Sequence, residues 1–170
     1  MFERWKQRRR NREIVDALYA EIVERARQPR LFTTLGIADT VMGRFEALTI
    51  HMFLALARLK REPELGGLAQ ELVDRFVLDL DHSIRELGVG DQSVPKRMRK
   101  LTGIFYERVA AYDLALETRT RTALAQALVG RALASDEEDA AARLAAYMLE
   151  ENSRLADVPA ANFLAGRFSA

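Results

Sequence analysis

The chain has 170 residues, 49% of them hydrophobic and 30% charged, which is the balance of one globular domain with a sizeable core. It contains no cysteine, which excludes disulfides and thiol chemistry, and its net charge of +1 excludes a strongly basic or acidic protein. The longest run without a charged residue, 47–57, is about half of the roughly 20 residues that a membrane helix needs, so no membrane span is expected.

The charge is concentrated in a basic N-terminal arm, residues 1–13. Six cations and one acid give residues 1–12 a net charge of +5, so the remaining chain carries −4. A helix here would place Phe2 and Trp5 on a short apolar stripe beside a cationic face, which suits anionic lipid or RNA phosphate. A solvated arm that binds nothing explains the same residues equally well. The candidate membrane or ribosome contacts are Trp5, Arg8, Arg9 and Arg10.

Helical periodicity dominates the chain, and no strand alternation is found. The first predicted helix continues the arm to about residue 28, where Pro29 ends it. The connector 29–38 carries apolar side chains and is therefore expected to pack on the body. Asp39 is expected to cap a second helix to about residue 62, and its wide apolar surface predicts a central position.

Two long helices are predicted next, at about 68–87 and 94–117. Gly88 is expected to end the first of them in the left-handed region, and Ser93 to cap the second. Pro95 is tolerated in a first turn, because its missing N–H has no partner there.

The alanine-rich C-terminal part predicts a helix at about 119–134 and a capping box, Ser135 to Glu138, that starts a last helix to about residue 155. The apolar residues 163–168 predict either a docked final turn or a disordered tail. The sequence therefore predicts an all-α, single-domain bundle of roughly five to seven helices. Its parts are the arm, 1–13, a helical domain, 14–157, and a short tail, 158–170.

The start of the predicted 94–117 helix carries four cations, Lys96, Arg97, Arg99 and Lys100. A helix N-terminus is already partly positive, so these charges are unfavourable there unless another interaction compensates. Lys96 is expected to bond back to one of three acids, Asp79, Asp81 or Asp91. Arg99 and Lys100 are instead expected to face an anionic partner.

No nucleophile elbow, phosphate-binding loop, zinc motif or dinucleotide fingerprint is present, so no catalytic residue, cofactor or metal is predicted. His51 lies in an apolar run and is expected to be a buried ring with one hydrogen bond. A metal-dependent helical enzyme using Asp79, Asp81 and His82 is one alternative, although a solvated or salt-bridged acidic face explains these residues better. A helical RNA- or ribosome-binding module, argued from the two basic clusters, is another alternative.

Two motifs, Asp39-Thr-Val-Met-Gly-Arg-Phe45 and Leu87-Gly-Val-Gly-Asp-Gln-Ser-Val94, resemble the ubiquinol–cytochrome c chaperone family, and the resemblance covers about 15–120. Pro95 departs from the family pattern, which favours a small residue there. The matching positions are Asp39, Gly43, Arg44, Phe45, Asp79, Asp81, Arg85, Gly88, Gly90, Asp91, Ser93 and Lys96. The candidate partner contacts are Arg44, Asp79, Asp81, Asp91, Lys96, Arg97, Arg99 and Lys100.

The resemblance implies a non-enzymatic chaperone that binds newly made cytochrome b and promotes assembly of the respiratory cytochrome bc complex (complex III). Mitochondrial members of the family also work at the ribosome tunnel exit, which makes the ribosome a further candidate partner. The basic arm adds an anionic membrane surface as a candidate, and no DNA partner is expected. Because no mitochondrial-length leader or membrane anchor is seen, the chain looks like a bacterial member. Such a member is expected in the cytoplasm, peripheral on the inner face of the inner membrane.

Overall fold

The structure, a computed structural model, describes residues 2–169, with side chains from residue 6 onward. It confirms the predicted all-α single-domain bundle, and among the described residues the only strand-like pairing is an isolated bridge between Val129 and Leu133. None of the described helices is long and apolar enough to cross a membrane. The helices are, in order, α1 (Phe2–Ala26), α2 (Arg30–Thr33), α3 (Val41–Leu59), a 3-10 helix η1 (Pro63–Leu65), α4 (Gly66–Glu86), α5 (Val94–Glu117), α6 (Arg121–Leu128), α7 (Glu138–Ala156) and α8 (Ala160–Leu164).

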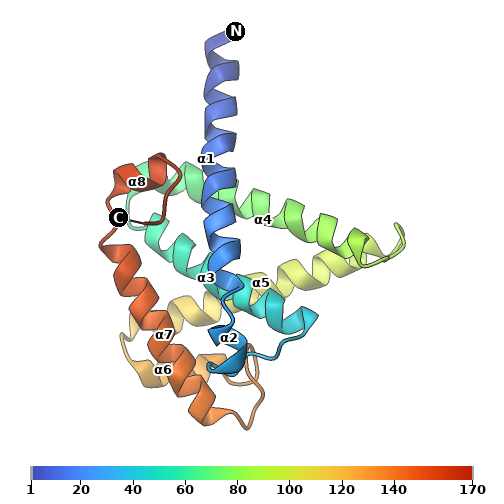
Figure 1. The fold of residues 1–170 in the computed structure, drawn as a ribbon, viewed down its shortest axis with the longest axis vertical. Helices are drawn as coiled ribbons and strands as arrows, with labels where there is room; N and C mark the ends of the chain where they lie inside the picture. Colours follow the sequence, from blue (N-terminus) through green and yellow to red (C-terminus); the bar gives the residue numbers. More distant parts are fainter. Residues whose placement is uncertain (1, 170) are drawn as a thin grey trace.

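Helix α3 is central, as predicted, and packs against α1, α4, α5 and α7 (Figure 1). Between residues 45 and 56 every side chain except Leu48 is buried. Phe45 and Phe76 are both buried, as expected, and the Phe76 ring lies 4.6 Å from that of Phe105, centroid to centroid. Burial of such side chains stabilises a fold by about 1.5–3 kcal/mol each, so these rings fix α4 and α5 onto α3.

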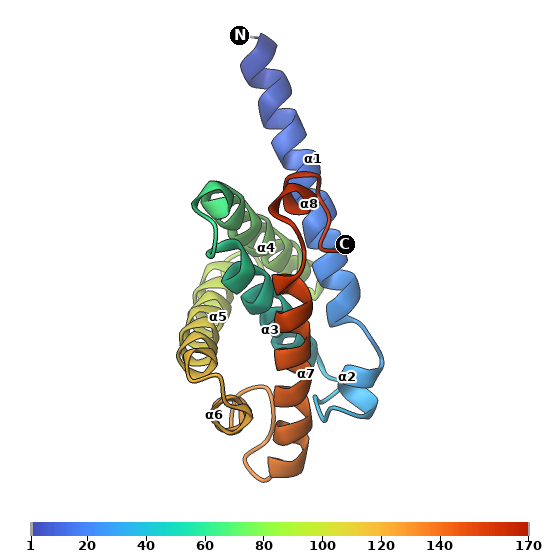
Figure 2. The ribbon, with the colours of Figure 1, turned by 90° about the vertical axis from the view of Figure 1, so that its left-hand side faces the viewer.

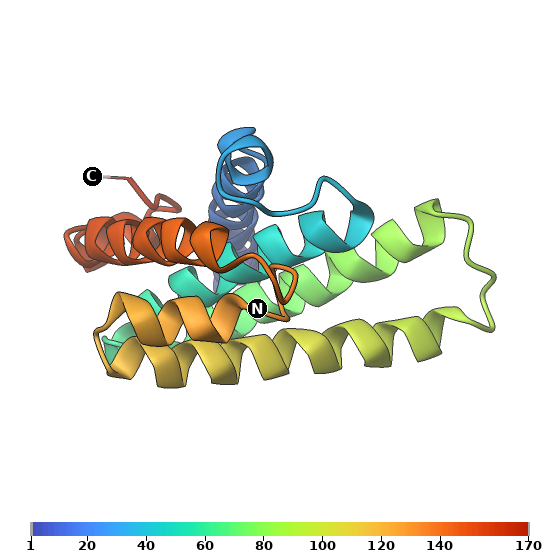
Figure 3. The same cartoon turned by 90° about the horizontal axis from the view of Figure 1, so that it is seen from below.

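Two segments extend away from this core. The N-terminal half of α1 protrudes from the body (Figures 1 and 2), and burial against the core begins only at Ile14 and Val15. The predicted basic arm is therefore the free end of a continuous helix. Helices α4 and α5 form a long antiparallel hairpin whose turn, residues 87–93, lies at the far edge of the molecule (Figure 3).

The N-termini of α3 and α5 differ from the sequence predictions. Thr40, not Asp39, caps α3, because its hydroxyl accepts a hydrogen bond from the Gly43 N–H at 3.0 Å. The Asp39 carboxylate, one residue earlier, binds Arg44. Ser93 precedes α5, as predicted, but its side chain makes no capping hydrogen bond.

The predicted helix 119–134 is shorter than expected, since α6 ends at Leu128. Val129 is extended, Gly130 has a φ of +73°, and the Gly130 N–H donates to the Leu133 carbonyl. The chain therefore forms a closed turn where composition favours a helix. The predicted capping box is also wrong, because α7 begins at Glu138 without a side-chain cap.

The C-terminal tail is docked on the body rather than disordered. Phe163 and Phe168 are buried and contact each other edge to face. The Phe168 N–H donates to the Glu21 carboxylate on α1, and the Arg154 guanidinium donates to the Phe168 carbonyl. Gly166, with a φ of +77°, lies against Ala17 of α1. The core thus extends to residue 168.

Candidate functional site

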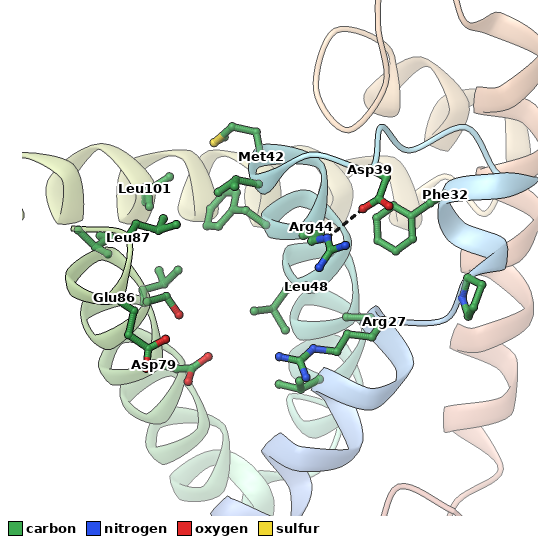
Figure 4. A pocket seen from close by; sticks show the side chains of 18 of the residues that line it. Arg27, Phe32, Asp39, Met42, Arg44, Leu48, Asp79, Glu86, Leu87 and Leu101 are labelled. Carbon is green, nitrogen blue, oxygen red and sulfur yellow. Dashed lines mark hydrogen bonds and ion pairs between the residues drawn. The ribbon is translucent and has the colours of Figure 1, made fainter. Parts of the chain in front are cut away.

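A groove of about 800 Å³ opens between α1, α3 and α4 (Figure 4). Its walls come from the C-terminal ends of α1 and α4 and the N-terminal end of α3, with Phe32 of α2 and Leu101 of α5 at its ends. The lining is mainly apolar and includes Phe45, Leu48 and Leu80. This volume lies in the range of sites that bind small molecules or receive side chains of a partner segment.

Exposed apolar side chains mark the mouth of the groove. Met42 is 44% exposed and Leu87 is 60% exposed, and both line it. Methionine is flexible and adapts to differently shaped apolar surfaces. Large apolar side chains that line a concave surface and stay in contact with water are typical of an interaction site.

Three acids and two arginines line the groove, and one of the acids, Asp39, pairs with Arg44 on the side formed by α1 and α3. Arg27 and Arg44 lie on the side formed by α1 and α3, whereas Asp79 and Glu86 lie on the α4 side (Figure 4). Within the described residues no ion pair crosses from one side to the other. The groove therefore offers an apolar floor between an acidic wall on α4 and an opposite side that carries Arg27 and the Asp39–Arg44 pair.

Asp79 is held in place by α1. The Tyr19 hydroxyl donates to its carboxylate at 2.7 Å, and the Arg75 guanidinium lies over the Tyr19 ring. Arg75 also bonds Asp16 at 2.8 Å. Burial, together with the hydrogen bond to Asp79, raises the pKa of Tyr19 well above its usual range, so the hydroxyl stays a donor. These contacts fix the acidic wall against the helix that carries the basic arm.

The first family-like motif builds one end of the groove. Thr40 caps α3, and Arg44 donates to Asp39 at 2.9 Å. The loop at Ala38 crosses Gly43 so closely that no side chain would fit there. The Asp39–Arg44 pair is largely solvent-exposed and contributes at most about 1 kcal/mol, so its main effect is to orient Arg44 at the groove.

The second motif forms the turn of the α4–α5 hairpin. Gly88 has a φ of +79°, as predicted for a residue that ends a helix in the left-handed region. Arg85 then bridges two acids, donating to Asp81 at 2.9 Å and to Asp91 at 2.8 Å. The hydrogen bond from Arg85 lowers the pKa of Asp81. Asp81 and Asp91 therefore connect the turn to α4 and do not face the groove.

Lys96 does not bond back to Asp79, Asp81 or Asp91, so that prediction is wrong. Arg85 lies one helical turn from Asp81 on α4 and reaches both hairpin acids, while Asp79 faces Tyr19. In the described part of the chain, none of the four cations of α5 forms an ion pair or side-chain hydrogen bond. All four are exposed: Lys96, Arg97, Arg99 and Lys100.

The residues considered for a metal site do not converge. Asp79 points to Tyr19, Asp81 to Arg85, and His82 is exposed. Across the described residues no group of three or more His, Asp or Glu side chains could hold a metal ion. The geometry gives no support to the metal-dependent alternative.

His51 is a buried structural residue, as expected, but its ring makes two hydrogen bonds where one was predicted. Its Nδ1 donates to the Ala47 carbonyl at 2.7 Å, so its Nε2 accepts from the Tyr147 hydroxyl at 2.6 Å. Burial lowers the pKa of His51 to about 4. The ring is therefore neutral at physiological pH and links α3 to α7.

The candidate arm contacts lie far from the groove. Arg8, Arg9 and Arg10 are exposed on the protruding half of α1, and Arg9 pairs with Glu13 at 3.1 Å. The Trp5 side chain lies outside the described residues.

The predicted partner residues thus occupy three places. Arg44 and Asp79 line the groove, Asp81 and Asp91 bind Arg85, and the four cations lie along α5. Sequence reasoning missed Arg27 and Glu86, which belong to no motif. Met42 could have been found, because it is an apolar residue in the first turn of a helix and lies within the first motif.

Comparison with known proteins finds a matching protein family and a similar crystal structure. The sequence pattern of the family described as Ubiquinol-cytochrome C chaperone matches residues 33–170. The crystal structure of the Cbp3 homolog from Brucella abortus is 42% identical in sequence, with a TM-score of 0.86, over 99% of this chain and 96% of that chain.

Two curated relatives match a shorter region. Ubiquinol-cytochrome-c reductase complex assembly factor 1 of Xenopus laevis is 27% identical over 97 residues, which are 56% of this chain and 48% of that protein. The protein of that name from Mus musculus is 26% identical over 97 residues, again 56% of this chain but 33% of that protein. The matched region therefore spans half or less of these relatives.

Proposed function

Because the chain belongs to the ubiquinol-cytochrome C chaperone family, we propose that it is a non-enzymatic chaperone for assembly of the ubiquinol–cytochrome c reductase complex (complex III). Its client is newly made cytochrome b, and the groove between α1, α3 and α4 receives an apolar segment of that client. The observation that carries this proposal is the apolar groove, which is bordered by Arg44 and Asp79, two of the positions that match the family.

The chemistry of the groove fits such a client. A membrane protein that has not yet been assembled exposes apolar surface, and each Å² of it that leaves water contributes about 25 cal/mol. Met42 and Leu87 offer exposed apolar contacts at the mouth. Arg27 on one side and Asp79 and Glu86 on the other suit a segment whose flanking loops carry charge of both signs, so they favour one orientation of the client over the reverse.

The proposal places the protein in the cytoplasm at the inner face of the inner membrane. There the protruding arm contacts anionic lipid or the ribosome tunnel exit. Support comes from its charge and position: Lys6, Arg8, Arg10 and Arg12 are exposed on a helix that stands clear of the body (Figure 2). Such a helix reaches an anionic surface without disturbing the fold.

Site-specific photocrosslinking in cells tests the client and the groove together. A photoreactive amino acid at Met42 is expected to give a crosslink to cytochrome b, detected by immunoblot or mass spectrometry. The matched control is Leu164 on α8, which is 46% exposed, close to the 44% of Met42, but does not line the groove.

Introducing a charge at Met42 or at Leu164 tests whether each position is needed for function. Met42→Glu is expected to lower the amount of assembled cytochrome b, measured by its haem absorbance in membranes, whereas Leu164→Glu leaves it unchanged. Both positions are exposed, so both variants should unfold at the wild-type temperature. Crosslinking to cytochrome b from Leu164 but not from Met42 would show that the groove is not the client site.

A further inference from the structure

The outward face of α5 carries an apolar strip with opposite charges at its two ends. Gly103, Tyr106, Ala110 and Leu114 recur at spacings of three and four residues and are all exposed, Tyr106 by 57% and Leu114 by 69%. A Cβ atom at Gly103 would meet nothing within 4 Å. We propose that this strip, named here the α5 strip, is the interface of an antiparallel homodimer, in which α5 packs on α5 of a second copy.

The charges at the ends of the α5 strip are self-complementary. Lys96, Arg99 and Lys100 lie on this face at its N-terminal end and Glu117 at its C-terminal end, and none of them has an ion pair among the described residues. A two-fold axis between Tyr106 and Glu107 sets Lys96 opposite the partner's Glu117. The two helix dipoles are then also antiparallel, which is the favourable arrangement.

The middle of the strip allows close approach of the two helices. The same axis places Gly103 opposite the partner's Ala110, so small residues face each other where the helices cross. The Tyr106 ring lies near the axis, beside the partner's Glu107, whose carboxylate charge is balanced by Arg108 and Arg131 of its own chain. Spacings of three and four residues over this length are those of a two-helix seam, and a two-fold interface repeats each contact twice.

The charge pattern favours a second copy over other occupants. A parallel pair would place cations against cations and Glu117 against the partner's Glu117. An acidic helix from another protein would satisfy Lys96 and Arg99 but would repel Glu117. Only a partner whose charges run in the reverse order satisfies both ends, and the chain itself is such a partner.

The dimer is expected to be weak and dependent on concentration. One pair of helices buries less surface than the roughly 1,200–2,000 Å² of a stable interface. Sedimentation velocity on the full chain over a wide concentration range should therefore show a reversible rise in the sedimentation coefficient. A coefficient that stays at the monomer value at every concentration would overturn the proposal.

Cysteine crosslinking tests the arrangement, since the chain has no cysteine of its own. A mixture of Gly103→Cys and Ala110→Cys chains should give a crosslinked dimer with a short bis-maleimide reagent. Each variant alone should give little, because equivalent residues of the two copies lie about 10 Å apart along the helix axis, from the rise of about 1.5 Å per residue. Leu164→Cys on α8 is the control. Equal crosslinking by each variant alone would overturn the antiparallel arrangement.

Charge exchange provides an independent test. Glu117→Lys alone and Lys96→Glu alone should each raise the dimer dissociation constant about tenfold, because like charges then meet at both ends. An equimolar mixture of the two variants should restore dimerisation, since opposite charges meet again. Both residues are exposed and both exchanges suit the helix dipole, so neither variant should lower the unfolding temperature. Failure of the mixture to regain dimerisation would overturn the proposed pairing.

Discussion

Gly43 faces the carbonyl oxygen of Ala38 so closely that a Cβ atom on it would lie 1.7 Å from that oxygen. The loop before α3 therefore crosses the first turn of the helix at a distance that only glycine permits. This contact also sets the position of Arg44 and Phe45 at the end of the groove. The requirement is steric, because the neighbouring atom is backbone and cannot rotate away.

Gly43→Ala is accordingly expected to lower the free energy of unfolding by about 3 kcal/mol, as the loop must move to admit a methyl group. Urea denaturation measures this change. The matched control is Gly103→Ala on the open face of α5, which should raise the free energy of unfolding by about 0.5–1 kcal/mol through better helix propensity. Wild-type stability for Gly43→Ala would contradict the close approach.

The buried, neutral state of His51 predicts a dependence of stability on pH. The pKa of His51 is lowered to about 4 by burial, whereas in the unfolded chain it returns to 6.5. The unfolded state therefore binds more protons between these values, and stability is lost as the pH falls from 6.5 towards 4. Over this range the titration of His51 lowers the free energy of unfolding by about 3 kcal/mol.

Comparing the wild type with His51→Gln by urea denaturation at several pH values isolates this contribution. The difference in free energy of unfolding between the two proteins should shrink as the pH is lowered through that window. A constant difference would show that His51 is not the group responsible.

The two ion pairs of Arg85 predict which residue orders the hairpin turn. Arg85→Met should speed amide hydrogen exchange in residues 87–93, because Asp81 and Asp91 lose the group that connects them. Lys96→Met, which removes an exposed and unpaired cation, should leave exchange in this turn unchanged. Faster exchange in Lys96→Met together with unchanged exchange in Arg85→Met would show that Lys96, and not Arg85, binds these acids.

Deletion of residues 1–12 should weaken association with anionic vesicles or ribosomes and leave the domain folded. The folded core is expected to survive because burial begins only after the deleted segment, at Ile14 and Val15. Vesicle flotation and ribosome sedimentation, each at low and at physiological salt, measure the two associations separately. Unchanged behaviour in both assays would mean that the arm binds neither.

The sequence alone was sufficient to predict the architecture, because apolar periodicity reports burial directly. The central position of α3 follows from apolar residues on several of its faces, and Phe45 and Phe76 are buried as expected. The choice between adjacent candidates for a helix cap was harder to predict. Asp39 and Thr40 are both good capping residues, and in the structure Thr40 caps α3 whereas Asp39 binds Arg44.

The site was predicted less completely, since it depends on distances between residues far apart in the chain. Arg27 and Glu86 meet at one groove through the packing of α1 and α4, and neither belongs to a motif. The wrong partner for Lys96 has a different cause, because Arg85 lies only four and six residues from Asp81 and Asp91 and binds both through local contacts. Motifs identify which residues matter, whereas packing decides what they contact.

Helix α1 is uninterrupted from the basic arm to the groove, with Arg8 on its free half and Arg27 at the groove wall. Nineteen residue steps at about 1.5 Å each separate the backbones of Arg8 and Arg27, which follows the last residue of α1, by about 29 Å along the helix axis. The docked tail, whose Gly166 lies against Ala17, packs on this helix where it enters the body. Under the proposed function, a surface bound by the arm would therefore lie at a fixed distance from a segment bound in the groove.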